Sequence, residues 1–222
     1  MAIDAELDAL YSDAERLLDD ESVADDDHVK RTLVDTAIEK ATELVHRSPD
    51  NPDFHHLLGL AWYHHPDKTD ARLDQIRSAF QRALSLDPQH QFANQYLGYI
   101  NFDVADYADA YERFASTNHE FFFSIDQKWR SLKATELAFV CQLRLGRDID
   151  LDKLNQFFAF YLAEEREQVP NTVIPIELRR CAEWLFDQTG NVDDEPLRSI
   201  VDFLHASGDL QLSGHAGLKA AR

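Results

Sequence analysis

The chain has 222 residues, 44% of them hydrophobic, and is therefore long enough to bury a sizeable core. Its formal net charge of −19 comes from 41 acidic and 22 basic residues, and it argues against nucleic acid or an anionic membrane as a direct partner because both would be repelled. Only seven Gly and seven Pro, without clear period-two segments, favour an all-helical chain.

The N-terminal region predicts an amphipathic helix over residues 3–20, with apolar residues on one face. The acidic segment 19–27 follows, and we expect a solvated loop whose last aspartates cap the next helix. Asp25, Asp26 and Asp27 are alternatively a docking site for a basic partner. A second helix is predicted over residues 29–47, so residues 1–49 would form a leading hairpin.

Two helical hairpins with a repeating pattern are predicted next, over residues 52–86 and 91–118. Pro49 matches Pro88 and Leu58 matches Leu97, each pair separated by 39 residues. Agreement at a fixed offset is the signature of a repeat protein.

This pattern resembles the tetratricopeptide repeat over about residues 34–118. One copy reads His55-x2-Leu58-Gly59-x2-Trp62 and then Ile76-x3-Phe80-x2-Ala83-x4-Pro88, and the next reads Asn94-x2-Leu97-Gly98-x2-Asn101 and then Tyr107-x2-Ala110-x3-Phe114. Small residues such as Gly59 and Gly98 are expected to let the paired helices approach closely. The first copy is longer than the usual repeat, and we place its extra residues at 64–69, between its helices.

Further helices are predicted over residues 126–145, 150–167, 174–189 and 195–206, and residues 207–222 form a tail. Phe121 to Ile125 predicts a dense apolar connection, either buried under the next helix or exposed as a ligand patch. We therefore expect one all-α domain over residues 1–206, a tetratricopeptide-like solenoid of about five hairpins and ten helices. It would comprise the leading hairpin 1–49, two recognisable repeats over 50–124, and repeat-like hairpins over 125–206.

The resemblance implies a partner-binding groove, because the first helix of each hairpin lines the concave face in tetratricopeptide proteins. Carried over to this sequence, the groove residues are His56, Leu60, Tyr63, Phe92, Gln95, Tyr99 and Phe102. Residues 53–64 and 91–103 contain no Lys or Arg, so the clamp that some family members use for a C-terminal carboxylate is absent from the two recognisable repeats. An aromatic, acid-edged groove suits an apolar or basic peptide or helix. The alternative is that Tyr99 and Phe102 simply pack against a neighbouring helix.

No sequence pattern predicts catalysis, a cofactor or a metal site. The histidine pairs His55-His56 and His64-His65 lack the three- or four-residue spacing that directs two rings at one ion. There is also no Gly-rich phosphate loop and no nucleophile elbow.

The sequence therefore predicts a non-enzymatic protein–protein interaction module, an adaptor or scaffold that binds a basic or amphipathic partner. Two alternatives remain: an acidic inhibitor or immunity-type protein that neutralises a basic toxin or nuclease, and a dedicated chaperone that shields an apolar client segment. The acid-rich N-terminus lacks a signal-peptide pattern, and both cysteines fall in apolar helical pattern, so we expect a cytoplasmic protein. The longest apolar run, residues 157–163, is too short to cross a bilayer.

Overall fold

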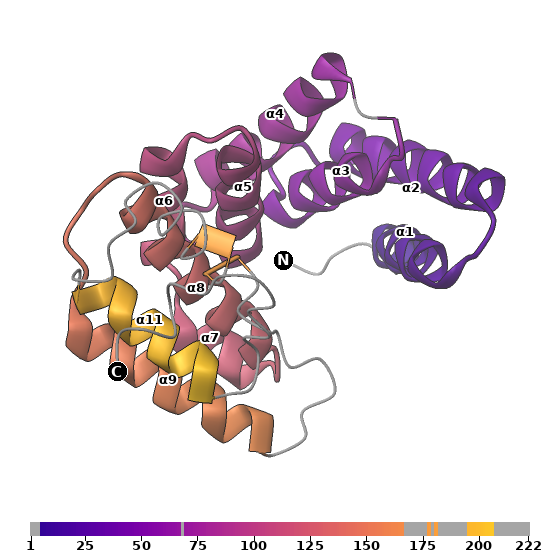
Figure 1. Ribbon diagram of the computed structural model, residues 1–222. Coiled ribbons are helices and arrows are strands. Elements are labelled where there is room, and N and C mark those ends of the chain that lie inside the picture. Colours follow the sequence, from indigo (N-terminus) through magenta and orange to yellow (C-terminus); the bar gives the residue numbers. More distant parts are fainter. Residues whose placement is uncertain (1–4, 68, 167–176, 179, 182–194, 207–222) are drawn as a thin grey trace. The chain divides into compact units, whose positions relative to one another are not determined.

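The computed structural model describes residues 5–67, 69–166, 177–178, 180–181 and 195–206. The helices are α1 (Ala5–Val23), α2 (Asp27–Arg47), α3 (Pro52–His64), α4 (Asp70–Leu86), α5 (Gln91–Asp103), α6 (Tyr107–Ala115), α7 (His119–Ser124), α8 (Lys128–Arg144), α9 (Leu151–Arg166) and α11 (Glu195–Ala206) (Figure 1). The described ranges contain no strand, which confirms the predicted all-helical class for that part of the chain. Within the same ranges, no helix is both long and apolar enough to span a membrane.

Two local predictions differ from the structure. Helix α1 continues to Val23, so most of the predicted acidic loop is helical and only residues 24–26 connect α1 to α2. The helix is prolonged because its acidic residues can be solvated on an exposed helix face. Asp26 caps α2 as predicted: its Oδ1 accepts hydrogen bonds from the backbone N–H of His28 at 2.8 Å and of Val29 at 3.0 Å.

The apolar segment after α6 is a short helix rather than an irregular connection. Asn118 caps α7 by accepting from the N–H of Phe121, and helical spacing then separates the three phenylalanines. Phe122 is buried, whereas Phe123 is 39% exposed. Neither the fully buried nor the fully exposed interpretation of this segment is therefore correct. The predicted helix 174–189 and the tail 207–222 lie almost entirely outside the described residues.

The chain divides into two compact units, residues 1–100 and 101–222, and the division falls within α5. The single domain over residues 1–206 expected from the sequence stays a prediction, because the repeat pattern runs through this position. In the N-terminal unit α2 contacts both α1 and α3, and α3 pairs with α4. Side chains of α4 and α5 share a further cluster that includes Ile76, Phe80 and Leu97.

Small residues sit where these helices come closest. Ala14, Ala37, Ala41 and Ala61 are fully buried in the cluster formed by α1, α2 and α3. Between α3 and α4 the approach is closer still, because a Cβ atom on Gly59 would lie 2.7 Å from Cε1 of Phe80. Real side chains do not reach that distance, so this crossing requires glycine, as the repeat pattern predicts.

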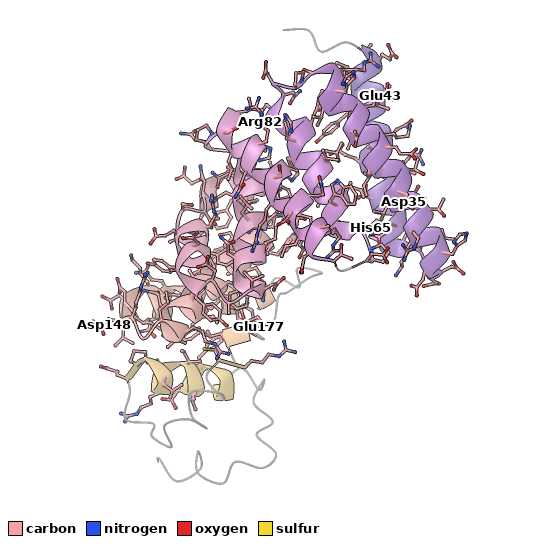
Figure 2. All side chains as sticks on the ribbon, turned by 90° about the horizontal axis from the view of Figure 1, so that it is seen from above. Asp35, Glu43, His65, Arg82, Asp148 and Glu177 are labelled. Carbon is pink, nitrogen blue, oxygen red and sulfur yellow. The ribbon has the colours of Figure 1, made fainter. Side chains whose placement is uncertain are left out.

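The longer loop between α3 and α4 is held against α2. Arg31 donates two hydrogen bonds to the carboxylate of Asp67, at 2.6 and 2.7 Å. Nε2 of His65 lies 3.1 Å from Oδ1 of Asp35, and these two labelled residues lie close together in Figure 2. Arg72 donates to the backbone carbonyl of His65. The Arg31–Asp67 pair is about half exposed, so it positions the loop more than it stabilises the unit, whereas the side chain of His65 is only 11% exposed.

Helix α8 is central to the C-terminal unit, where it contacts α6, α7 and α9. The core is rich in aromatic side chains, and the closest ring pair is Phe158 with Phe203, stacked with centroids 3.9 Å apart. Phe203 comes from α11, which packs on α9.

A buried carboxylate ties α8 to residues 177–178. Glu136 is 1% exposed, and its Oε1 accepts from the backbone N–H of Glu177 at 2.9 Å and of Leu178 at 3.0 Å. Its Oε2 accepts from Nζ of Lys133 at 2.8 Å. Burial raises the pKa of Glu136, although Lys133 and the two N–H groups act in the opposite direction. The carboxylate is thus a structural group that satisfies two buried backbone donors.

We expect Gly59→Leu to lower the free energy of unfolding by about 1–3 kcal/mol, because the added side chain must displace the ring of Phe80. Chemical denaturation followed by far-UV circular dichroism would measure the change. Ala9→Leu is the matched control, since Ala9 is exposed on α1. Gly59→Ala combined with Phe80→Leu should cost less than the sum of the two single changes. Strict additivity would contradict the close contact.

We expect Glu136→Ala to be strongly destabilising, by roughly 3–5 kcal/mol, because it leaves two buried N–H groups and Lys133 without their acceptor. Glu136→Gln keeps one carbonyl acceptor of similar shape and should cost clearly less. Urea unfolding of both variants measures the difference. Equal stability of Glu136→Ala and the parent chain would show that this carboxylate is dispensable.

Candidate functional site

Helices α1, α3 and α5 of the N-terminal unit carry a set of aromatic side chains that are neither buried nor fully exposed. We call this set the aromatic face; its members are Tyr11 of α1, His56 and Tyr63 of α3, and Phe92, Tyr96 and Tyr99 of α5, all half-buried. Helix α1 contacts α3, and the rings of α3 meet those of α5. The rings of α3 and α5 therefore form one connected set, and Tyr11 of α1 meets the neighbouring ring of Phe54 in α3, with centroids 5.9 Å apart.

Ring contacts hold the face in place. His56 lies with its ring centroid 5.6 Å from that of Phe92 and 6.1 Å from that of Tyr96. Tyr96 also meets Tyr63 edge to face at 5.1 Å and Tyr99 at 5.9 Å. Underneath, Tyr96 stacks on the buried ring of Phe80 at 5.3 Å. Such packing fixes the orientation of the rings before any partner arrives.

Carboxylates border the aromatic face. Glu15 of α1 and Asp53 at the start of α3 are both exposed. His90, whose Nε2 lies 3.3 Å from Oδ1 of Asp53, holds the pKa of that carboxyl below its ordinary value. Burial, and then the charge and hydrogen bond of Glu15, raise the pKa of Tyr11. Burial also raises the pKa of Glu15, with the charges of Asp19 and Asp53 adding to it. This border is therefore a region of mutually repelling negative charge.

Positive charge in this unit is kept away from these helices. Arg16 is the single Lys or Arg of α1, α3 and α5, and it pairs with Asp13 and Asp20 of its own helix. The other Lys and Arg residues in the described helices of the N-terminal unit lie on α2 and α4: Lys30, Arg31, Lys40, Arg47, Arg72, Arg77 and Arg82. Several of them are engaged in ion pairs, such as Lys40 with Asp13 and Arg47 with Glu6. The aromatic face thus presents carboxylates and rings without competing cations.

The structure separates the predicted groove residues into two groups. His56, Tyr63, Phe92 and Tyr99 are half-buried members of the aromatic face. Leu60 is half-buried against the cluster of α1, α2 and α3. Gln95 is 1% exposed and so cannot contact a partner without repacking, because its helical register turns it toward the interior. Phe102 packs against the core of the C-terminal unit and meets Tyr107 edge to face at 5.5 Å, which agrees with the alternative that it serves packing.

The acidic docking residues have distinct roles. Asp26 is committed to capping α2, and its hydrogen bonds with Val29 and His28 lower its pKa. Asp25 and Asp27 are exposed. They lie at the turn between α1 and α2, next to Val23, which is 78% exposed.

Sequence reasoning missed Tyr11, Glu15 and Tyr96. The leading hairpin lacks the repeat's signature residues, so no position of α1 could be matched to a groove position. One signal was available in the sequence, because residues 52–64 and 91–103 contain several aromatic residues and no Lys or Arg, and residues 5–23 contain Arg16 as their single base.

The histidines of α3 pair with protein groups rather than converge on one point. His55 Nε2 lies 2.8 Å from the carbonyl of Pro49, and Nδ1 of His64 lies 2.8 Å from Oε2 of Glu21. Among the residues that the structure describes, no group of three His, Cys, Asp or Glu side chains is placed to hold a metal ion.

No family model matches the chain, and no curated protein matches it. The assignment of a function therefore rests on the residues of the chain itself.

Both cysteines should be unreactive in the folded protein. Cys141 and Cys181 are free and buried, and burial raises their pKa values to about 12 and about 11. Since the thiolate is the reactive form, we expect a disulfide reagent at neutral pH to label them only at the rate of local or global unfolding. Labelling in urea should be rapid. Rapid labelling of the native chain would show that at least one thiol is accessible.

Proposed function

We propose that the chain is a tetratricopeptide-like protein-binding module whose aromatic face receives a peptide or helix with both apolar and basic side chains. The observation that carries the proposal is the combination of half-exposed rings on α1, α3 and α5 with the exposed carboxylates of Glu15 and Asp53, while the Lys and Arg residues of the described helices in this unit, apart from Arg16, lie on α2 and α4. Preformed aromatic surfaces are common anchors of protein interfaces.

The helix order supports the repeat interpretation. Helices α1 and α2 pair, as do α3 and α4, while α1 also contacts α3. This alternation is what stacked antiparallel hairpins produce, and it places first helices beside first helices. The glycine at the closest approach of α3 and α4 fits the same interpretation. By extension, the remaining helices would continue a solenoid of about ten helices.

Electrostatics supports a basic partner. Asp53 is already paired with His90, but a basic partner would also be attracted to the exposed carboxylate of Glu15 and would reduce the negative charge beside the rings. An acidic partner would add to it. The same reasoning suits the inhibitor alternative, in which the whole acidic surface meets a basic protein. The dedicated-chaperone alternative requires apolar contact only.

Salt dependence separates these alternatives. At about 1 M salt the screening length falls to ~3 Å, so binding that depends on many exposed charges is lost. Binding to the aromatic face should weaken with salt but persist, because the rings contribute apolar contact that salt does not screen. Complete loss would favour the inhibitor, and no change would favour the chaperone.

A short amphipathic Leu/Lys peptide and its Leu/Glu counterpart are suitable probes for the full chain. We expect the Leu/Lys peptide alone to bind. Phe92→Ala should weaken its binding roughly tenfold or more, as anchors in interfaces do. Isothermal titration calorimetry would measure both, with thermal melts to confirm that the variant is folded.

Glu15→Lys supplies the charge test, and Glu39→Lys is its matched control. Both replace an exposed glutamate of the same unit, but Glu39 lies on α2. We expect a loss of affinity for Glu15→Lys well beyond that for Glu39→Lys. If the two variants bind the Leu/Lys peptide equally, general attraction and not the aromatic face explains the binding.

A further inference from the structure

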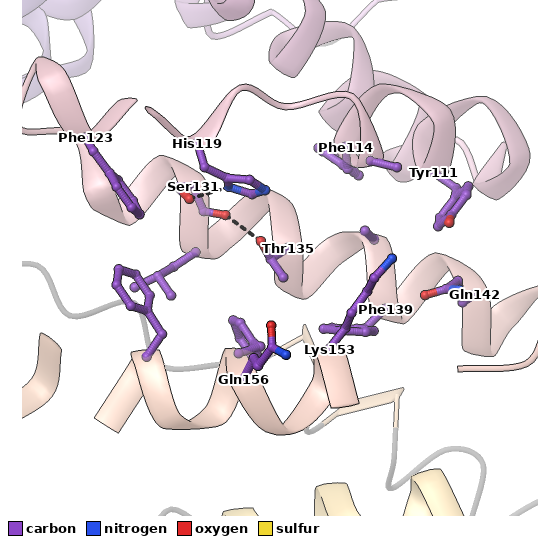
Figure 3. A pocket seen from close by; sticks show the side chains of 15 residues that line it. Tyr111, Phe114, His119, Phe123, Ser131, Thr135, Phe139, Gln142, Lys153 and Gln156 are labelled. Carbon is purple, nitrogen blue, oxygen red and sulfur yellow. Dashed lines mark hydrogen bonds between the residues drawn. The ribbon is translucent and has the colours of Figure 1, made fainter. Parts of the chain in front are cut away.

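The C-terminal unit contains an open pocket of about 610 Å³ between α6, α7, α8 and α9 (Figure 3). Pockets of several hundred Å³ are typical of sites for small molecules. No groove residue predicted from the sequence contributes to it.

Five phenylalanines and Tyr111 are among the 15 residues that line the pocket. Phe114, Phe139 and Phe157 are buried in the core behind the pocket. Phe123 and Phe160 also line it and stack on each other, with ring centroids 5.4 Å apart. Phe123 remains 39% exposed despite this contact. The pocket therefore offers apolar surface that the fold itself does not cover.

The charges of the lining are opposite to those of the protein as a whole. The chain has 41 acidic residues, yet none of the 15 lining residues is Asp or Glu. Lys153 of α9 is the lining residue with a permanent charge; its side chain is 75% exposed, and its Nζ lies 4.0 Å from Oδ2 of Asp150. The guanidinium of Arg147 adds positive charge beside the wall, 5.2 Å from the ring centre of Tyr111.

Amide side chains accompany this lysine. Gln156 of α9 and Gln142 of α8 line the pocket with Lys153, and Figure 3 shows Lys153 and Gln156 directed from α9 toward α8. On the other side of the pocket, Nδ1 of His119 lies 2.6 Å from Oγ of Ser131, so these two polar groups satisfy each other. Desolvation lowers the pKa of His119, which keeps its ring neutral at neutral pH. Positive charge in the lining is thus concentrated at Lys153.

We propose that this pocket binds a small amphipathic molecule with an apolar body and one carboxylate. The apolar body would lie against the phenylalanine walls. The carboxylate would pair with Lys153 and accept a hydrogen bond from the amide of Gln156, whereas the amide of Gln142 already donates to the backbone carbonyl of Asp148 at 3.2 Å. A charge-assisted hydrogen bond at the edge of an apolar cavity both orients such a ligand and rejects its cationic analogue.

Three probes that share one alkyl chain test the proposal on the full protein: dodecanoate, dodecanol and dodecyltrimethylammonium. Calorimetric titration below the micelle concentration should show saturable binding in the order dodecanoate, dodecanol, dodecyltrimethylammonium. Lys153→Gln should weaken dodecanoate binding about tenfold and leave dodecanol binding unchanged. Lys30→Gln, on α2 of the other unit, is the control and should change neither.

A second variant tests the location. Ala138 lines the pocket and is half-buried, so Ala138→Phe should fill the cavity and reduce binding of all three probes. If that variant fails to fold, Gln156→Trp obstructs the same site from an exposed position. Equal binding of dodecanoate and dodecyltrimethylammonium, no effect of Lys153→Gln, or unchanged binding after the pocket is filled would each overturn the proposal. The site is separate from the aromatic face, so Lys153→Gln should not alter binding of the Leu/Lys peptide.

Discussion

The N-terminal unit depends on the close approach of α3 and α4, which is possible because residue 59 is glycine. The ring of Phe80 occupies the space that a Cβ atom would need. The same ring stacks on Tyr96 and lies 5.8 Å from the ring of His56, both in the aromatic face. The close contact between Gly59 and Phe80 in the core therefore helps to fix the positions of the rings of Tyr96 and His56. In repeat-like helical packing, the core contact and the binding surface are two sides of the same helix pair.

Apart from Arg16, the Lys and Arg residues in the described helices of the N-terminal unit lie on α2 and α4. Bases on α2 and α4 pair with carboxylates that secure the loop after α3 or join α1 to α2, as Arg31 does with Asp67 and Arg47 with Glu6. These exposed pairs contribute little stability singly. The scarcity of Lys and Arg on α1, α3 and α5 has a larger consequence, because Arg16 is the single such residue of these helices and it pairs with Asp13 and Asp20. This arrangement is suited to selecting a partner by charge.

The two units offer surfaces of opposite character. The aromatic face is bordered by acids, whereas the pocket of the C-terminal unit has a lysine and no acid in its lining. A ligand that suits one is disfavoured by the other. If both proposals hold, a single acidic chain binds a basic segment of a partner and an acidic small molecule at independent sites. The buried carboxylate of Glu136 belongs to neither, and its two backbone hydrogen bonds serve the architecture of the C-terminal unit.

The sequence by itself determined what depends on neighbours along the chain. Apolar periodicity, caps and prolines predicted α2 to α6, α8, α9 and α11 closely, and the repeat pattern identified Gly59 as a point of close approach. Tertiary structure decided the rest. Gln95 is buried, Phe102 packs against the C-terminal core, and the charge of Asp53 acts on Tyr11. Each of these depends on which helices pack together, and the spacing of residues within one helix does not determine that. The pocket could not be predicted from the sequence either, because its lining residues come from four helices. That none of these lining residues is acidic can be seen only once the helices are packed together.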